Sequence, residues 1–302
     1  MIDKHLDKQL MDLNQRYQAI ARSQAYVGYT NKNRYLYNLK HLNIRSIISD
    51  LRYRSYGKRN FSTKGNSLIC NEEIQNVSNF KIAVYSCVVG RYDPFIEPVY
   101  CERDIDYYMF TDQELSKCSV WKKIDISNWD DYKQLSPLML NRKLKILQNE
   151  LLLTYDYTIY VDGNVEIVAG VSPLIARMKN FGFGVHYHRS RDCIVDEVVS
   201  VKHLKRLAGK EMDKQIANYL SQGFPRHNGL FENSILVRDN RNVCVQALMR
   251  YWWDEYNKYQ TRDQLSLPYV IWKTKFDTNK ILILGSDVEM NPRFNRLNVH
   301  LQ

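Results

Sequence analysis

The chain has 302 residues, of which 44% are hydrophobic and 25% charged, the composition of a globular protein with a sizeable core. No apolar run approaches the roughly 18 residues of a membrane span, so the sequence predicts no spanning helix. The net charge of +10 suits an anionic partner such as an acidic membrane surface, a phosphorylated acceptor or a nucleic acid. The six cysteines show no CxxC or other metal spacing, which favours reduced thiols in a cytosolic protein.

A basic N-terminal region precedes the body of the protein. Residues 1–78 hold 13 lysines and arginines against 6 aspartates and glutamates, an excess of seven positive charges. Leu6, Leu10, Leu13 and Tyr17 recur at helical spacing, and residues 36–51 suggest a second helical stretch. We predict a basic helical appendage with a linker over residues 1–78 and a second domain over residues 79–302. The appendage could dock on an anionic membrane, although a solvated face explains the charge equally well.

Apolar strand-like runs alternate with helical patterns through the rest of the chain. This alternation predicts an α/β fold with a mostly parallel sheet covered on both faces. The strands are predicted at residues 81–90, 106–112, 120–124, 157–161, 183–188 and 233–237, and the helices at residues 137–152, 172–179, 193–220, 243–256 and 264–272.

The stretch from Tyr157 to Asn164 organises this body. A buried strand is predicted up to Val161, and Asp162-Gly163-Asn164 follows at its carboxyl end, where open α/β sheets bind ligands. A carboxylate and an amide oxygen two residues apart suit a divalent cation whose other ligands come from a diphosphate. The alternative is an ordinary turn, because Asp, Gly and Asn are the commonest turn residues.

Three further polar clusters follow or open regular elements, where a site on a rigid scaffold is typically built. They comprise His186, His188, Arg189 and Arg191 after one strand, Glu232 and Asn233 before another, and Arg262, Asp263 and Gln264 at the start of a helix.

Six sequence blocks follow one another along the body of the chain: CVVGRYDPF, YYMFTD, the helix that carries Arg142 and Lys145, YDYTIYVDGN, GFPRHNGLFENSILVR and RDQLSLPYV. In this order they resemble a family of glycosyltransferase-like domains long catalogued as a domain of unknown function. The family occurs in bacterial capsule and surface-polysaccharide loci and in plant cell-wall proteins. The resemblance covers roughly Lys81 to Lys273 and implies a GT-A type fold.

The resemblance implies a hexosyltransferase that uses a nucleotide sugar, such as a UDP-hexose, and a divalent metal, Mn²⁺ or Mg²⁺. The acceptor would be a growing surface glycan, free or lipid-linked. Asp162 and Asn164 would bind the metal as a variant of the usual Asp-x-Asp motif, and Asn164 would weaken the site because its amide is neutral. A late histidine often completes such sites, and His300 is the candidate, although a histidine near a terminus is commonly just exposed.

The donor's nucleotide and diphosphate also need ligands. Arg142 and Lys145, one helical turn apart, would neutralise the diphosphate, unless they form a solvated helix face. Tyr92, in the loop after the first strand, and Asp112, after the second, would contact the nucleotide; for Asp112 a turn cap is the alternative. The cluster of His186, His188 and Arg191 would contact phosphate or acceptor, with Glu197 on the next helix orienting it.

Asp263 and Gln264 resemble the Asp-Gln pair of glycogenin-like retaining enzymes, and they would stabilise the oxocarbenium-like centre from beneath the sugar ring. As an alternative, Asp263 is a helix N-cap. Glu232 would contact sugar or acceptor hydroxyls, or serve as an inverting base; otherwise it is a buried carboxylate paired with Arg238.

Two other functions compete with glycosyl transfer. Tyrosines interleaved with arginines between Arg34 and Arg59 suit a nucleic-acid-binding protein, although we expect no nucleic acid as partner. A catalytically silent partner subunit is the other. We expect a cytoplasmic protein, peripheral on the inner face of the membrane.

Overall fold

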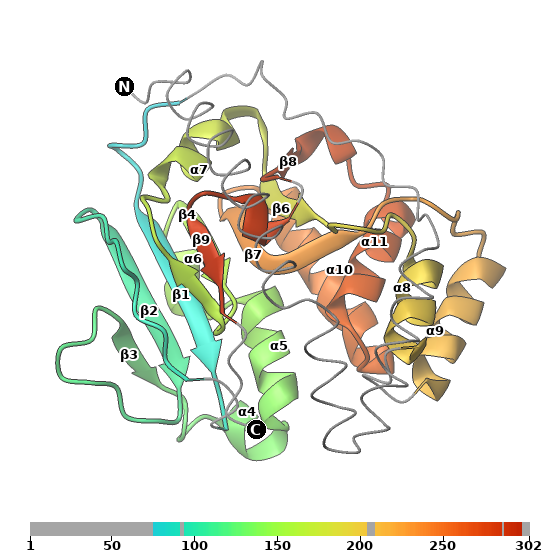
Figure 1. Cartoon of the computed structure of the whole chain (residues 1–302), viewed down its shortest axis with the longest axis horizontal. Helices are drawn as coiled ribbons and strands as arrows, with labels where there is room; N and C mark the ends of the chain where they lie inside the picture. Colours follow the sequence, from blue (N-terminus) through green and yellow to red (C-terminus); the bar gives the residue numbers. More distant parts are fainter. Residues whose placement is uncertain (1–74, 91–93, 204–208, 286, 298–302) are drawn as a thin grey trace, which may run out of the picture.

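The computed structural model describes residues 75–90, 94–203, 209–285 and 287–297. Its centre is a seven-stranded sheet in the order β3-β2-β1-β4-β7-β6-β8 (Figure 1). Only β7 runs against its neighbours, which confirms the predicted α/β fold with a mostly parallel sheet. The strands are β1 Ile82–Val88, β2 Ile105–Thr111, β3 Lys122–Asp125, β4 Tyr157–Val161, β6 Phe183–Tyr187, β7 Phe231–Asp239 and β8 Ile281–Ile283.

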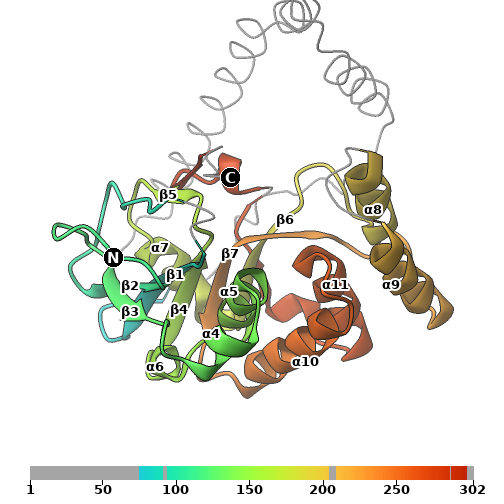
Figure 2. The same ribbon diagram turned by 90° about the horizontal axis from the view of Figure 1, so that it is seen from below.

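Helices cover both faces of the sheet, as Figure 2 shows from below. Side chains alternate along each strand, so β1 buries Tyr85 on one face and Val84 on the other. The first face packs against α5 (Pro137–Leu147), α8 (Ile194–His203), α9 (Lys210–Ser221), α10 (Val243–Tyr259) and α11 (Asp263–Lys273). The second packs against α7 (Ser172–Ala176) and the turn of 3-10 helix at Arg177–Asn180.

The predicted helix over residues 137–152 is in fact two helices. It breaks after α5 because Gln148 adopts a positive φ of 65°, which no helix continues through. The Asn149 side chain then caps α6 (Glu150–Leu153) by accepting the amide of Leu151 at 2.9 Å.

The predicted helix over residues 193–220 is also divided. α8 ends at His203 and α9 begins at Lys210 after Gly209. Gly209 is not helical, and residues 204–208 lie outside the described part of the chain. The shorter elements α4 (Asp130–Gln134), β8 and the small sheet of β5 (Val165–Ile167) with β9 (Phe294–Arg296) were not predicted.

Residues 1–74 lie outside the described part of the chain, so the helical appendage stays a prediction. Just after them, Gln75 is attached to the body, because its Nε2 donates to the Tyr157 hydroxyl at 2.9 Å and to the Ile175 carbonyl at 2.8 Å. Among the described residues, no helix is both long and apolar enough to cross a bilayer.

Candidate active site

A cavity of about 350 Å³ lies where β4 and β6 end and β7 begins. β7 is antiparallel, so its first residues share the edge at which its parallel neighbours end. α5, α8 and α11 supply further walls, together with the segment that leads into β9. The cavity is lined by Arg142, Lys145, Asp162, His188, Arg189, Ser190, Arg191, Glu197, Ser200, Val201, Glu232, Asn233, Ser234, Arg262, Asp263, Gln264, Asp287, Glu289 and Arg296.

The predicted clusters therefore meet in one place. Lys145 joins two of them, since its Nζ lies 3.2 Å from Asp162 Oδ1 and 2.9 Å from Asp263 Oδ2. Tyr160 also donates to Asp162 Oδ1, at 2.8 Å. A lysine that is only 2% exposed thus bridges the end of the central strand to the start of α11.

The surroundings of Asp263 keep its carboxylate ionised. Burial alone would raise its pKa, but the cations of Lys145 and Arg142 outweigh burial and hold the pKa well below its usual value. Asp263 is the first residue of α11, and Arg262 occupies the N-cap position. The N-cap alternative for Asp263 is therefore wrong.

Glu197 on α8 gathers the basic residues of the opposite wall. Its carboxylate lies 2.5 Å from Arg191 Nε and 3.3 Å from Arg262, and His188 Nε2 is 3.6 Å away. Burial lowers the pKa of His188 to about 4, so its ring is neutral near pH 7. A neutral imidazole beside these fixed cations offers hydrogen bonds without adding charge.

Gln264 links the walls of the cavity. Its Oε1 accepts from Arg262 Nε at 3.1 Å and its Nε2 donates to the Phe231 carbonyl at 3.3 Å. Gln264 is thereby fixed beside Asp263 at the floor of the cavity.

Glu232 pairs with a residue that the sequence did not suggest. Its Oε1 lies 2.5 Å from Arg296, and its Oε2 accepts the amide of Val288 at 3.0 Å. Burial raises the pKa of Glu232, although the charge of Arg296 opposes it. Glu232 is therefore a buried carboxylate paired with an arginine, as the alternative held, but the predicted partner is wrong: Arg238 donates to the Tyr85 hydroxyl at 2.6 Å instead.

Asn233 was singled out in the sequence without a role. It is 2% exposed, yet neither its amide oxygen nor its amide nitrogen has a hydrogen-bond partner among the described residues. A buried amide without partners costs free energy unless a ligand or water satisfies it. Asn233 also lines the cavity, which makes it a candidate ligand-binding residue.

Some predicted residues do not reach the cavity. His186 is fully buried in β6, where its Nε2 contacts Asn291 Nδ2 at 3.0 Å, so it is not placed to contact phosphate. Asp112 accepts hydrogen bonds from the Gly90 amide and the Tyr132 hydroxyl and fixes the turn after β1. Tyr92 and His300 lie outside the described residues.

The cavity also contains residues that sequence reasoning missed. Asp287, Glu289 and Arg296 come from a segment without any recognisable pattern. They reach the cavity because β9 pairs with β5, directly after the Asp162 turn. Only this tertiary pairing could have revealed them.

A divalent metal fits this cavity only in part. Asp162 Oδ2 accepts no hydrogen bond from the described residues, so it is available, whereas Asn164 does not line the cavity. Among the described residues, Asp162 does not lie in a group of three His, Cys, Asp or Glu residues whose ligand atoms are close enough to share a metal ion. This donor set suits a metal that arrives with its own phosphate ligands better than a metal held by protein alone.

Fold and cavity together define an α/β protein with a densely charged cavity at the edge of its sheet. The chain belongs to the TOD1/MUCI70 glycosyltransferase-like domain family, which it matches over residues 55–298. This confirms the glycosyltransferase-like family predicted from the sequence. The match begins inside the region predicted as an appendage. No curated protein matches the chain.

Two solved structures to which the chain is similar, both at low sequence identity, are those of glycosyltransferases. The X-ray structure of the mannosyltransferase Ktr4p from S. cerevisiae has 13% identity and a TM-score of 0.36, covering 74% of this chain and 75% of that one. The apo structure of the bifunctional glycosyltransferase WbbM has 10% identity and a TM-score of 0.43, covering 70% of this chain and 40% of that one.

Proposed function

We propose that this protein is a glycosyltransferase of GT-A type that moves a hexose from a nucleotide sugar to a surface glycan. The observation that carries the proposal is the Asp162–Lys145–Asp263 bridge at the carboxyl edge of the sheet. Family membership supports the reaction class. The bridge supports the location, because it joins the proposed metal ligand to the residue proposed to lie beneath the sugar.

The charged side chains of the cavity suit a donor that carries both a diphosphate and sugar hydroxyls. Six cationic side chains, Arg142, Lys145, Arg189, Arg191, Arg262 and Arg296, face six carboxylates, Asp162, Glu197, Glu232, Asp263, Asp287 and Glu289. The cations would bind a diphosphate by exchanging part of their present pairing for phosphate oxygens. The carboxylates would accept hydrogen bonds from sugar hydroxyls.

Asp162 would hold Mn²⁺ or Mg²⁺ through its available Oδ2. When bound, the metal would neutralise the diphosphate and make it a better leaving group. Asn164 remains a second candidate ligand, by rotation of its side chain. Lys145, 3.2 Å from Asp162 Oδ1, would fix the orientation of that carboxylate.

Asn233 would recognise the hexose. Its amide offers both donors and an acceptor, and since the described residues supply no hydrogen-bond partner, these groups would serve sugar hydroxyls. A sugar without the matching hydroxyl would leave this buried amide unsatisfied, which makes Asn233 a residue that selects the donor.

The reaction would retain the anomeric configuration. The bond between the sugar C1 and the phosphate oxygen breaks, the acceptor oxygen bonds to C1, and the acceptor proton passes to the departing phosphate. Asp263 and Gln264 would stabilise the positive charge on the ring from the other side. Both oxygens of Glu232 are engaged, by Arg296 and by the Val288 amide, which argues against Glu232 as the inverting base.

Thermal stabilisation by a panel of nucleotide sugars, with and without Mn²⁺, tests the proposal. We expect one donor class to raise the unfolding midpoint in the presence of metal, since a ligand of the folded state stabilises it by mass action. Asp162→Ala should remove the metal dependence, and Asn233→Ala should reduce the shift. Asp125→Ala, far from the cavity, is the matched control. Stabilisation by nucleic acid alone, lost steeply with salt, would contradict the proposal.

A further inference from the structure

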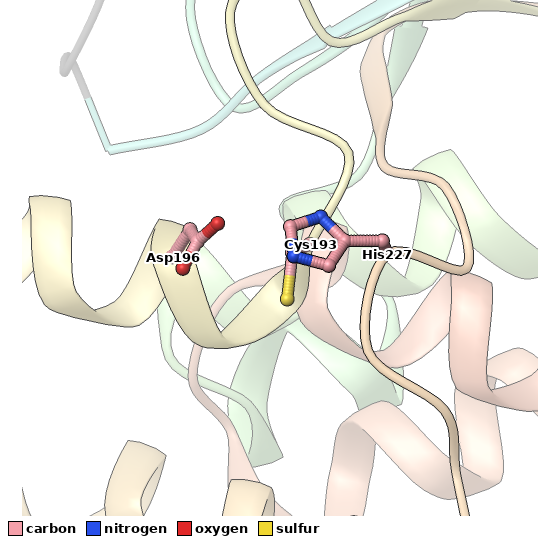
Figure 3. Close-up of side chains that lie close together, drawn as sticks. All are labelled: Cys193, Asp196 and His227. Atoms are coloured by element: carbon pink, nitrogen blue, oxygen red, sulfur yellow. The ribbon is translucent and has the colours of Figure 1, made fainter. Parts of the chain in front are cut away.

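A second group of metal-binding side chains lies beside the cavity, at the start of α8. Cys193 directly precedes the helix and Asp196 is in its first turn, while His227 comes from the loop between α9 and β7. The ligand atoms of all three residues lie within 4.8 Å of one another. Figure 3 shows the Cys193 thiol beside the His227 imidazole, with the Asp196 carboxylate to one side on the first turn of α8.

The histidine ring is already oriented. His227 Nδ1 lies 2.7 Å from Asp192 Oδ1, which leaves Nε2 as the nitrogen for a metal. Metal-binding histidines commonly pair their other nitrogen with a carboxylate, which fixes the ring and makes it a stronger ligand. The Asp192 carbonyl also accepts the amide of Gly229 at 2.9 Å and so ties down the loop that carries His227.

We propose that Cys193, Asp196 and His227 bind a zinc ion, with Asp192 positioning the histidine. One sulfur, one nitrogen and one oxygen donor suit Zn²⁺, whereas Mg²⁺ and Ca²⁺ prefer oxygen ligands alone. Tetrahedral zinc with these ligands needs separations of roughly 3.5 Å between ligand atoms. Because the ligand atoms are at most 4.8 Å apart, the side chains would close by at most about 1.3 Å, and water would fill the fourth position.

This zinc ion would have a structural effect on the neighbouring cavity. Asp196 precedes Glu197, the carboxylate that gathers Arg191 and Arg262. Zinc would pin the first turn of α8 to the loop before β7, and with it the position of Glu197. The ion is separate from the metal proposed at Asp162, because the two sites share no ligand.

The test uses the full chain, freed of metal by a chelator and titrated with Co²⁺ as a spectroscopic substitute for Zn²⁺. We expect one equivalent to bind and to give a near-ultraviolet thiolate-to-cobalt charge-transfer band, which added Zn²⁺ abolishes. Cys193→Ser should remove the band. Cys118→Ser and Cys244→Ser, which alter exposed free cysteines, should keep it, as should Asp162→Ala.

Zinc affinity provides a second measurement that does not depend on replacing the buried cysteine. Asp192→Asn should weaken zinc binding by about 10- to 100-fold, the usual effect of losing such a partner. His227→Gln, at an exposed position, should weaken it further while the circular dichroism spectrum stays unchanged. Absence of stoichiometric binding by the wild-type chain, a cobalt band that survives Cys193→Ser, or an unchanged affinity in His227→Gln would each overturn the site.

Discussion

Lys145 is the residue on which the architecture of the cavity depends. It is buried between Asp162 and Asp263, which come from elements a hundred residues apart in the sequence. Each of these charges would be costly to bury alone, and their mutual pairing offsets that cost. The same pairing keeps a carboxylate charged at the floor of the cavity, where a developing positive charge on the sugar ring would need it.

Replacement of Lys145 by methionine should destabilise the protein by about 3–5 kcal/mol, because it leaves Asp263 buried without its closest cation. Urea unfolding measures the change. Lys143→Met removes a partly exposed partner of Asp131 at 2.6 Å and should cost less than about 1 kcal/mol. Adding Asp263→Asn to Lys145→Met should recover part of the loss. Equal effects of the two lysine replacements would contradict this account of the bridge.

Two neutral histidines should make stability depend on pH. Burial lowers the pKa of His188 to about 4 and that of His186 to about 3, against about 6.5 in the unfolded chain. The unfolded state therefore takes up protons first. The contribution of these histidines to the free energy of unfolding is complete above pH 6.5. It falls as the pH drops toward 4, by up to about 1.4 kcal/mol per pH unit for each histidine.

Urea midpoints measured between pH 7 and pH 5 check this dependence. His188→Gln should flatten the slope and leave the contribution of His186. An equally steep slope in His188→Gln would mean that His188 does not titrate below its ordinary range.

The start of α10 is fixed by one side chain. Asn242 Oδ1 accepts the amides of Cys244 and Val245 at 3.0 and 3.3 Å. Asn242→Ala should therefore cost about 1 kcal/mol of stability, measured by thermal unfolding. Val243→Ala, at a side chain that is 71% exposed, should change stability by less than about 0.5 kcal/mol. If both replacements have the same effect, the cap contributes nothing.

The sequence predicted the elements where periodicity was strong. The apolar run over residues 81–90 became β1, and the pattern that ends at residue 161 became β4. Breaks within helical patterns were missed, since the positive φ of Gln148 is enforced by tertiary contacts such as its hydrogen bond to Thr158 at 2.5 Å. β9 has three residues, too few for any pattern to register.

The sequence predicted the clusters of polar residues that make up the site, but not the ion pairs that these residues form with one another. Asp162, Asp263 and Glu232 stand next to strand ends or helix starts, and local sequence shows this. The pairing of Glu232 with Arg296 joins residues 64 positions apart, and no local rule selects Arg296 over Arg238. The burial of His186 was missed because the neighbouring residues do not show which way a histidine side chain at the end of a strand points.

The basic region over residues 1–78 should localise the enzyme to anionic membranes. Replacement of Arg45, Arg52 and Arg54 by glutamine should weaken binding to anionic vesicles by about 100-fold, at about 1 kcal/mol for each arginine near the surface. Co-sedimentation with phosphatidylserine vesicles measures this. Lys122→Gln, on β3, is the single-charge control within the body. Unchanged vesicle binding, or loss of donor turnover in the triple variant, would contradict a purely localising role.

We expect the cavity around Asp162, Lys145 and Asp263 to transfer a hexose from a nucleotide sugar. Time-resolved NMR of the purified chain with nucleotide hexoses tests this expectation. Either Mn²⁺ is removed from the sample before detection, or Mg²⁺ is used in its place. We expect release of the nucleoside diphosphate and a first-formed sugar with the donor's anomeric configuration, and Asp162→Ala should abolish both. An inverted product that disappears in Glu232→Gln would transfer the catalytic role to Glu232, and turnover that persists in Asp162→Ala with a chelator present would contradict the assignment of the cavity.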